Sequence, residues 1–227
     1  MSNLLIIFAK APEPGQVKTR LSPYISKRNA AKLYEAFMID TLAFTVHIPA
    51  DRALACSPNP DHPFFSRCKA NHPLRTFAQQ GTNLGARMKH AFEWGYSKAF
   101  EKVILIGSDA PTLPTAFIRD AFDCLSRRDV VLGPSLDGGY YLIGAKTPLP
   151  DIFSHQDWSS ERVLRNTLKK LNDEKQSYEL LPFWYDIDRP DDLFFLIEHL
   201  KYQSCRGTPL PKATSDMLGA IGVNKDH

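Results

Sequence analysis

The chain has 227 residues, enough for one sizeable hydrophobic core, and its 43% hydrophobic and 23% charged residues are ordinary for a soluble globular protein. A formal net charge of +3, without a run of Lys or Arg, does not indicate nucleic-acid binding, so a small molecule is the default partner. The first apolar run, residues 4–9, is too short for a signal peptide, and no run approaches the roughly 20 residues of a membrane span.

The four cysteines lie far apart, without a C-x-x-C pair or a histidine at zinc-binding spacing. They are Cys56, Cys68, Cys124 and Cys205, and three of the four sit among apolar neighbours. Buried thiols in a reducing compartment are the expectation, which predicts a cytoplasmic protein.

Short apolar runs alternate with amphipathic segments along most of the chain. Strands are expected at residues 4–9, 52–56, 75–79, 103–106, 130–134, 140–144 and 178–181. Helices are expected from Ser26 to about 42, at 64–69, after Gly85 through Phe100, and at 115–126. Two more are expected, from Ser159 or Ser160 to about 172 and from Pro190 to 203. This order predicts a three-layer α/β fold with a mostly parallel mixed sheet.

The helix that follows Ser26 carries a predicted buried stripe of Ala30, Leu33, Tyr34, Phe37, Thr41 and Leu42. Thr115 is expected to cap the helix that it begins. No linker divides the chain, so residues 1–203 are predicted to form a single domain. Residues 204–227 are predicted to be a loosely attached tail with a short helix from Ser215 to Ile221.

The strand at 103–106 stops abruptly at Gly107-Ser108-Asp109-Ala110-Pro111. In open α/β sheets ligands bind just outside the carboxyl ends of the strands, so Asp109 occupies a position where chemistry is usually done. A lone Asp after a strand is weak evidence for a functional site. The hypothesis also depends on other loops that follow predicted strands.

The loop after the first strand supplies cations. Two prolines and a glycine exclude an α-helix there, and Lys18, Thr19 and Arg20 follow. Arg and Lys hold phosphate oxygens well, although the spacing of a Walker A loop is absent. The alternative is a solvated loop with scattered charge.

Asp186 and Asp188 form a second acidic position, and in an extended segment their side chains project the same way. Together with Asp109 they could hold Mg²⁺, which usually takes one or two protein carboxylates along with waters and phosphate oxygens. Asp191 and Asp192 are more simply explained by the first turn of a helix, where acidic residues favour the helix dipole.

Two glycine-containing segments have both functional and structural interpretations. Gln79 to Arg87 could read a nucleotide base, or could be a plain helix entry capped by Thr82 or Asn83. Asp137-Gly138-Gly139 could line an acceptor site, but is also typical of a hairpin turn.

Four segments together resemble one transferase family: residues 9–21, 107–111, 137–141 and 186–193. The chain is similar to the glycosyltransferase-like proteins called radical SAM/selenodomain-associated transferase 1, which in turn resemble phospholactate guanylyltransferases. The resemblance covers roughly residues 3–200. It implies the nucleotide-diphospho-sugar transferase (GT-A) fold and a divalent metal, Mg²⁺ or Mn²⁺. One departure is that only Gly15 precedes Lys18-Thr19-Arg20, where nucleotidyltransferase loops often read G-x-G-[ST]-R.

The resemblance also implies roles for individual residues. Lys18, Arg20 and Asp109 would be catalytic. Asp109 and Asp188 would bind the metal, with Asp186 as a substitute ligand. The expected nucleotide-binding residues are Ala9, Lys10, Gly15, Thr19, Gln80, Gly81, Thr82 and Ser108. The expected acceptor-binding residues are Asp137, Gly138 and Gly139.

The leading hypothesis is a metal-dependent transferase that moves a nucleotidyl group from a nucleoside triphosphate to a phosphorylated small-molecule acceptor. The cationic first loop favours this reaction, because a triphosphate gains more from Lys18 and Arg20 than a nucleotide-sugar does. A glycosyltransferase with a nucleotide-sugar donor and a non-catalytic nucleotide-binding protein are the alternatives. The sequence does not identify the acceptor, the base or the oligomeric state.

Overall fold

A computed structural model describes residues 2–154, 158 and 160–223. The chain folds into two compact units. Unit 1 comprises Met1–Ala9, Ile48–Gly107 and Pro114–Tyr185, and unit 2 comprises Lys10–His47, Ser108–Leu113 and Asp186–His227. The chain thus passes from unit 1 into unit 2 at the carboxyl ends of two strands, after residues 9 and 107, and again after residue 185.

Unit 1 is built on a seven-stranded sheet in the order β3-β2-β1-β4-β6-β5-β7. Its strands are β1 (Asn3–Lys10), β2 (Asp51–Ser57), β3 (Arg75–Ala78), β4 (Lys102–Ile106), β5 (Val130–Pro134), β6 (Tyr140–Lys146) and β7 (Tyr178–Leu180). The pairs β1–β4, β2–β3 and β5–β7 are parallel, whereas β6 is antiparallel to both of its neighbours. The predicted mixed, mostly parallel sheet is confirmed.

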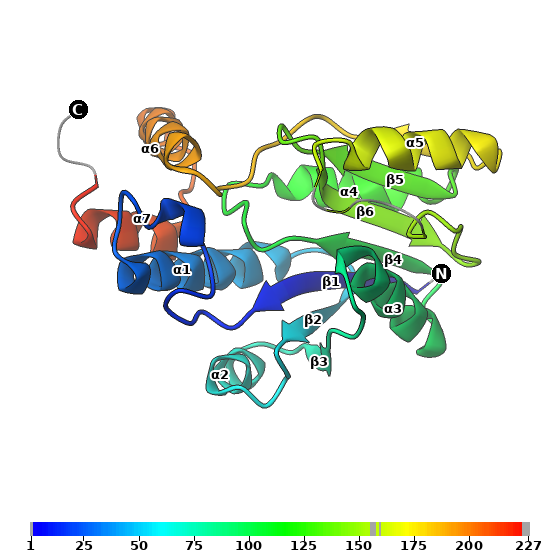
Figure 1. The fold of residues 1–227 in the computed structure, drawn as a ribbon, viewed down its shortest axis with the longest axis horizontal. Helices are drawn as coiled ribbons and strands as arrows, with labels where there is room; N and C mark the ends of the chain where they lie inside the picture. The colour runs from blue at the N-terminus through cyan, green and yellow to red at the C-terminus, as the bar shows by residue number, and fades with distance from the viewer. Residues whose placement is uncertain (1, 155–157, 159, 224–227) are drawn as a thin grey trace. The chain divides into compact units, whose positions relative to one another are not determined.

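Helices cover both faces of the sheet in unit 1 (Figure 1). These helices are α2 (Pro63–Asn71), α3 (Leu84–Ser97), α4 (Thr115–Cys124) and α5 (Val163–Asp173). Phe92 of α3 and Leu171 of α5 share a core with alternate residues of the strands, such as Leu105. On the other face, Leu125 at the end of α4 lies over Gly144, where an added Cβ would come within 3.2 Å of it. The three-layer prediction is therefore also confirmed.

Two helix starts differ from the sequence-based expectation. Thr115 is not a cap: Pro114 occupies the N-cap position in extended conformation, which its fixed φ allows, and Thr115 is already helical. Helix α5 begins at Val163 rather than at Ser160. The N–H of Leu164 donates to the carbonyl of Gly138 at 2.9 Å, so it does not donate to the carbonyl of Ser160, as it would if the helix began there. The alternative start at Ser159 lies outside the described residues.

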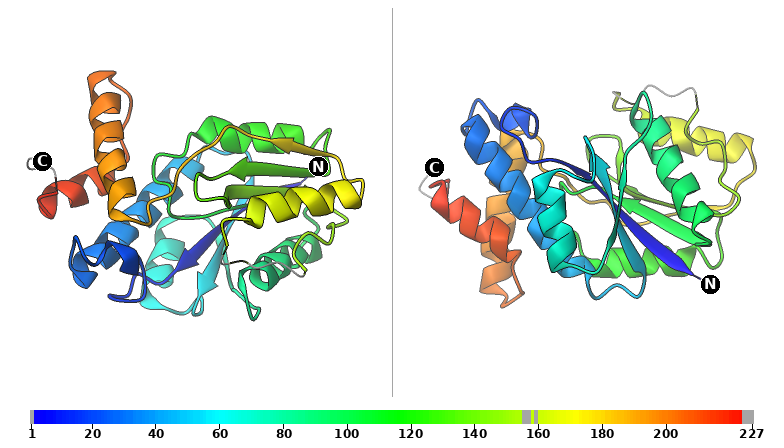
Figure 2. Two further views of the ribbon diagram at one scale, coloured as in Figure 1. Left: turned by 45° about the horizontal axis from the view of Figure 1, so that its top comes forward. Right: turned by 90° about the horizontal axis from the view of Figure 1, so that it is seen from below.

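Unit 2 contains the 3₁₀ turn η1 (Thr19–Leu21), α1 (Lys27–Thr45), α6 (Pro190–Cys205) and α7 (Lys212–Ala220). Ser26 caps α1 as predicted, with its hydroxyl accepting the N–H of Asn29, and the predicted stripe of α1 is buried. Helix α7 lies against α1 (Figure 2), where both carboxylate oxygens of Asp40 accept N–H groups, from Ala213 at 3.0 Å and Thr214 at 2.7 Å.

The remaining sequence-based expectations concern local features. Pro190 is the first residue of α6, as predicted, and the tail helix begins at Lys212, three residues earlier than expected. Cys56, Cys68 and Cys124 are buried free thiols, and Cys205 is exposed. Within the described residues, no helix combines the length and apolar character that a bilayer crossing requires.

Candidate functional site

The loop between β1 and α1 is held in shape by its own backbone. Gln16 donates its N–H to the carbonyl of Glu13 at 3.0 Å, next to Gly15, whose φ of 78° is easily reached only by glycine. The ammonium of Lys10 donates to the carbonyl of Gln16 at 2.8 Å. Val17, buried beyond this turn, anchors the loop. These contacts fix the position of the residue that follows Val17.

That residue, Lys18, has a left-handed backbone with φ 48° and ψ 38°. Such a conformation costs a non-glycine residue about 1–3 kcal/mol and persists where the surroundings determine it. Here the carbonyl of Lys18 accepts the N–H of the fully buried Leu21 at 3.0 Å, which closes η1. Thr19 and Arg20 are exposed, whereas the side chain of Lys18 is only 4% exposed.

The buried ammonium of Lys18 lies between two carboxylates from distant parts of the chain. Its Nζ is 2.6 Å from Oδ1 of Asp109 and 3.0 Å from Oδ1 of Asp188. Arg20 contacts the other oxygen of Asp188, Oδ2, at 3.2 Å. We call these four side chains the Lys18 cluster. All four were predicted site residues, and all belong to unit 2.

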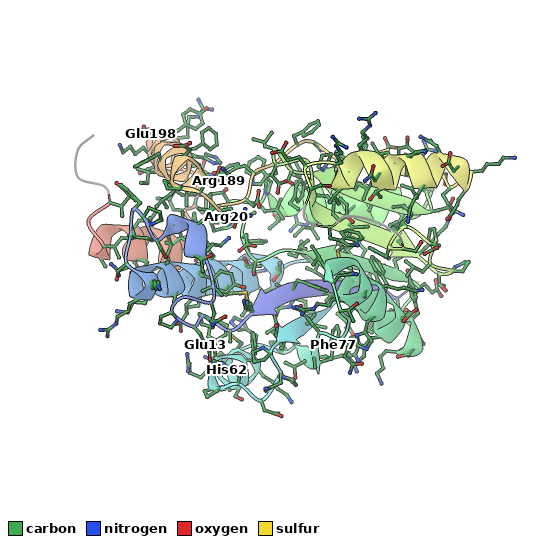
Figure 3. All side chains as sticks on the ribbon, in the orientation of Figure 1. Glu13, Arg20, His62, Phe77, Arg189 and Glu198 are labelled. Carbon is green, nitrogen blue, oxygen red and sulfur yellow. The ribbon has the colours of Figure 1, made fainter. Side chains whose placement is uncertain are left out.

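The charges of the cluster reinforce one another. Burial by itself would lower the pKa of Lys18, but the two carboxylates, Asp109 and Asp188, outweigh it and raise the pKa well above its usual value. Burial would raise the pKa of Asp188, but Lys18, Arg20 and Arg189 together lower it. Arg20 and Arg189 are labelled in Figure 3. Lys18 and Asp188 are consequently both charged across the neutral pH range.

Asp109 is positioned through the residue before it. The buried Ser108 hydroxyl lies 2.8 Å from the hydroxyl of Tyr34 in α1, and the Tyr34 hydroxyl also accepts the N–H of Lys10 at 3.0 Å. Burial and the nearby Asp109 charge raise the pKa of Tyr34 to about 12. Tyr34 thus ties the segment after β1 to the segment after β4.

Sequence reasoning placed Tyr34 only in the buried stripe of a helix and missed this contact. The usable signal was a phenol on that stripe, because a buried Tyr hydroxyl usually finds a hydrogen-bond partner. No sequence pattern indicated that Ser108 and Lys10 are the hydrogen-bond partners of this hydroxyl.

Asp188 is positioned by its backbone. The N–H of Ile187 donates to the carbonyl of Asp109 at 2.9 Å, which joins the two acidic segments directly. The carboxylate of Asp192, in the first turn of α6, accepts the N–H groups of Asp188 at 2.9 Å and Arg189 at 2.7 Å. Asp192 therefore has the structural role expected for it. Asp186 lies two residues before Asp188 and is half-buried.

The donor set of the cluster suits Mg²⁺ or Mn²⁺. Among the described residues, no group of three or more His, Cys, Asp or Glu side chains gathers as a complete metal site. Two carboxylates that already converge on one cation match the one or two protein ligands that Mg²⁺ takes when phosphate oxygens complete its shell. The residues present fit such a metal.

The segment predicted to face a base lies in unit 1, between β3 and α3. Asn83 caps α3 by accepting the N–H of Ala86 at 2.9 Å, which is the structural role that the sequence left open. Gln80, Gly81 and Thr82 precede it and are exposed. Next to them the amide of Gln79 donates to the carbonyls of Ala9, at 3.1 Å, and Ala55, at 2.8 Å. The buried Ala9 is thereby tied to the end of β3.

Asp137, Gly138 and Gly139, also in unit 1, form the turn between β5 and β6. The Asp137 carboxylate accepts the Gly139 N–H at 2.9 Å and a hydrogen bond from the Ser135 hydroxyl. Gly138 has a φ of 88°, and a Cβ on it would lie 2.2 Å from the carbonyl oxygen of Glu161. The hairpin interpretation is confirmed, and acceptor binding by these residues stays a prediction.

Comparison with known sequences identifies relatives over most of the chain. The family model described as "Uncharacterized protein conserved in bacteria (DUF2064)" matches residues 41–160, just over half of the chain. A 2-phospho-L-lactate guanylyltransferase from Methanobrevibacter smithii is 27% identical over 185 residues, which cover 81% of this chain and 80% of the relative. The enzyme of the same name from Methanothermobacter thermautotrophicus is 30% identical over 124 residues, 54% of this chain and 53% of the relative.

Comparison with solved structures gives the same fold. A protein from Desulfovibrio desulfuricans G20, provisionally named a nucleotide-diphospho-sugar transferase, superposes with a TM-score of 0.87 at 34% identity over 99% of both chains. A cytidylyltransferase from Leptospira borgpetersenii has a TM-score of 0.58 at 14% identity, over 99% of this chain and 95% of that one. The predicted nucleotide-diphospho-sugar transferase fold is confirmed, and the chain is a transferase.

Proposed function

The chain belongs to the family described as "Uncharacterized protein conserved in bacteria (DUF2064)", and from this premise we propose that it is a metal-dependent nucleotidyltransferase. In the proposed reaction, an oxygen of a phosphorylated small-molecule acceptor attacks the α-phosphorus of a nucleoside triphosphate, and pyrophosphate leaves. The observation that carries the proposal is the Lys18 cluster, in which two cations and two carboxylates converge.

Each member of the cluster has a role in this proposal. Lys18 and Arg20 bind the phosphate oxygens of the donor and neutralise the charge that develops as pyrophosphate departs. Asp109 and Asp188 hold the metal, which when bound acts as a Lewis acid on the phosphate oxygens. Most of the rate then comes from position and charge, because phosphoryl chemistry asks little covalent work of the protein.

The relatives suggest which substrates to try first. Two of them are named for guanylyl transfer to 2-phospho-L-lactate, so GTP and a phosphorylated hydroxy acid are the first donor and acceptor. Lys10, Gly15, Thr19 and Ser108 remain proposed nucleotide-binding residues, as do Ala9, Gln80, Gly81 and Thr82. Asp137, Gly138 and Gly139 remain the proposed acceptor-binding residues, and Asp186 the substitute metal ligand.

Glycosyl transfer from a nucleotide-sugar is the second candidate function. The observation that favours it is the 34% identical structure from D. desulfuricans, which carries the name of a nucleotide-diphospho-sugar transferase. The two functions differ in their donor, and Lys18 and Arg20 provide the distinction: three phosphates gain more from two cations than a sugar-capped diphosphate does.

Thermal unfolding in the presence of candidate donors tests the proposal. A panel of nucleoside triphosphates and nucleotide-sugars is run with and without Mn²⁺. Ligand at about 100 times its dissociation constant adds about 2.7 kcal/mol of stability. For a chain of this size this raises Tm by about 5–10 °C. We expect a Mn²⁺-dependent rise with a triphosphate, which Asp109→Asn abolishes.

Lys18→Ala separates the two candidate functions. It should remove the shift caused by triphosphates, and a shift retained with nucleotide-sugars would favour glycosyl transfer. If no donor moves the midpoint, with or without Mn²⁺, the nucleotide-binding role is refuted.

A further inference from the structure

We propose that Lys18 makes the site selective for the metal-chelated nucleotide. In the ligand-free protein, the ammonium of Lys18 occupies the position between the carboxylates that a bound metal would take. The inference deepens the proposed function and rests on it. It assigns Lys18 a second task besides phosphate binding: the lysine holds the carboxylates until a polyphosphate draws it away.

The distances set up a direct competition. Nζ of Lys18 lies 2.6 Å from Oδ1 of Asp109 and 3.0 Å from Oδ1 of Asp188. Mg²⁺ binds carboxylate oxygens at about 2.0–2.1 Å, so an ion that used these two oxygens would lie next to the ammonium. The second oxygen of Asp188 is also engaged, by Arg20 at 3.2 Å. An ion that bridges the two Oδ1 atoms would therefore require the lysine to move.

The charge balance of the cluster leads to the same conclusion. Two cations face two carboxylates, so the four charges cancel in the ligand-free protein. A metal ion alone would have to displace Lys18 and leave that ammonium without its counter-charges. A triphosphate alone would draw Lys18 away and leave two carboxylates facing its phosphates. When a metal and a triphosphate bind together, every charge keeps an opposite charge beside it. The two carboxylates then pair with the metal, and Lys18 and Arg20 pair with the phosphates.

Local structure allows Lys18 to move without unfolding the loop. Its left-handed backbone is fixed by the hydrogen bond to Leu21 and by the buried neighbour Val17, and neither contact involves the ammonium. The flexible stem of a lysine lets the ammonium swing while the backbone stays in place. The ring centroid of Tyr34 lies 6.0 Å from Nζ of Lys18, so the ring offers the ammonium a weak cation–π contact in addition to the carboxylates.

Titration of the protein with Mn²⁺ alone, followed by the electron paramagnetic resonance signal of free Mn²⁺, tests the inference without activity. Wild-type protein should bind Mn²⁺ weakly. Lys18→Met removes the competing charge and keeps the length of the side chain, so it should bind Mn²⁺ at least about tenfold more tightly. The matched control is Lys32→Met, which removes an equal charge from the exposed surface of α1 and should leave the Mn²⁺ affinity near that of wild type.

A second variant covers the case in which Lys18→Met fails to fold. Lys18→Asn also removes the ammonium, and Asn tolerates the left-handed conformation better than most residues, so it should tighten Mn²⁺ binding as well. Circular dichroism checks that both variants are folded. Unchanged or weaker Mn²⁺ binding in folded Lys18 variants overturns the inference, and so does an equal gain in Lys32→Met.

A parallel titration of wild-type protein separates this inference from the proposed function. The probe is α,β-methylene GTP, with Mn²⁺ or with EDTA. The inference predicts at least about tenfold tighter binding with Mn²⁺. Only the chelated nucleotide supplies an opposite charge to all four side chains of the Lys18 cluster. Equal affinity in the two conditions overturns the selectivity. Absence of binding in both conditions counts against the guanine nucleotide as donor, while the comparison of Mn²⁺ affinities still decides the role of Lys18.

Discussion

Replacing Tyr34 with Phe removes a single oxygen that ties the two segments of the site. The hydroxyl of Tyr34 accepts the N–H of Lys10 at 3.0 Å and lies 2.8 Å from the hydroxyl of Ser108. Each hydrogen bond contributes about 0.5–1.5 kcal/mol, and a donor left without its partner adds to the loss. The two together predict a loss of about 2 kcal/mol, which lowers Tm by about 4–8 °C in a chain of this size.

The same substitution should weaken metal binding, because Ser108 precedes Asp109 and its hydroxyl fixes the start of that segment. Residues that support a metal ligand typically change the affinity by about 10–100-fold. We therefore expect Mn²⁺, in the presence of α,β-methylene GTP, to bind Tyr34→Phe at least about tenfold more weakly than wild type. Calorimetric unfolding and Mn²⁺ titration measure the two effects.

Tyr202→Phe is the matched control, since it removes the same atom from a side chain that is 63% exposed on α6. It should leave both Tm and Mn²⁺ affinity at the wild-type values. If Tyr34→Phe behaves like this control, the hydroxyl of Tyr34 does not position Asp109 and that part of the account is refuted.

Three further substitutions test other parts of the structure. The pKa of Asp188 is lowered and that of Lys18 raised, so the stability they add is complete between about pH 5 and 10. The Tm difference between wild type and Asp188→Asn, in metal-free buffer, should shrink as pH falls below about 4; a constant difference contradicts the pairing. Gly138→Ala should lower stability by at least about 1–3 kcal/mol in urea unfolding, because its Cβ meets the Glu161 backbone; an unchanged midpoint contradicts this. Asp40→Asn should cost about 1–2 kcal/mol and speed hydrogen exchange in α7, since one of two N–H groups loses its acceptor; unchanged exchange contradicts the capping.

Much of the site could be predicted because its residues follow strands. Asp109 comes three residues after β4, and the loop that carries Lys18 follows β1, its parallel neighbour. The carboxyl ends of parallel neighbours lie at the same edge of a sheet, so the two segments start close together. Asp186 and Asp188 are predicted as a pair because they follow the late strand in an extended segment, and the family resemblance singles out Asp188.

The parts that escaped prediction depend on contacts without a sequence pattern. Tyr34 fits a helical stripe by its ring, and the stripe does not reveal where its hydroxyl goes. The left-handed backbone of Lys18 is unusual for a lysine, so residue preference argues against it. Helix α5 starts late because a carbonyl of a distant turn, at Gly138, accepts one of its first N–H groups. The contacts of Tyr34 and Gly138 are tertiary, whereas the backbone of Lys18 is fixed by a local hydrogen bond from Leu21 that residue preferences do not indicate.

The most direct test of the account is the fate of the α-phosphorus of GTP. GTP labelled at that atom is incubated with the wild-type protein, Mg²⁺ and 2-phospho-L-lactate or other phosphorylated hydroxy acids, and the products are separated. The account predicts that the label moves to an acceptor while one pyrophosphate is released per transfer, and that Asp109→Asn and Lys18→Ala abolish both. Equal rates of label transfer in wild type and in these two folded variants would contradict it.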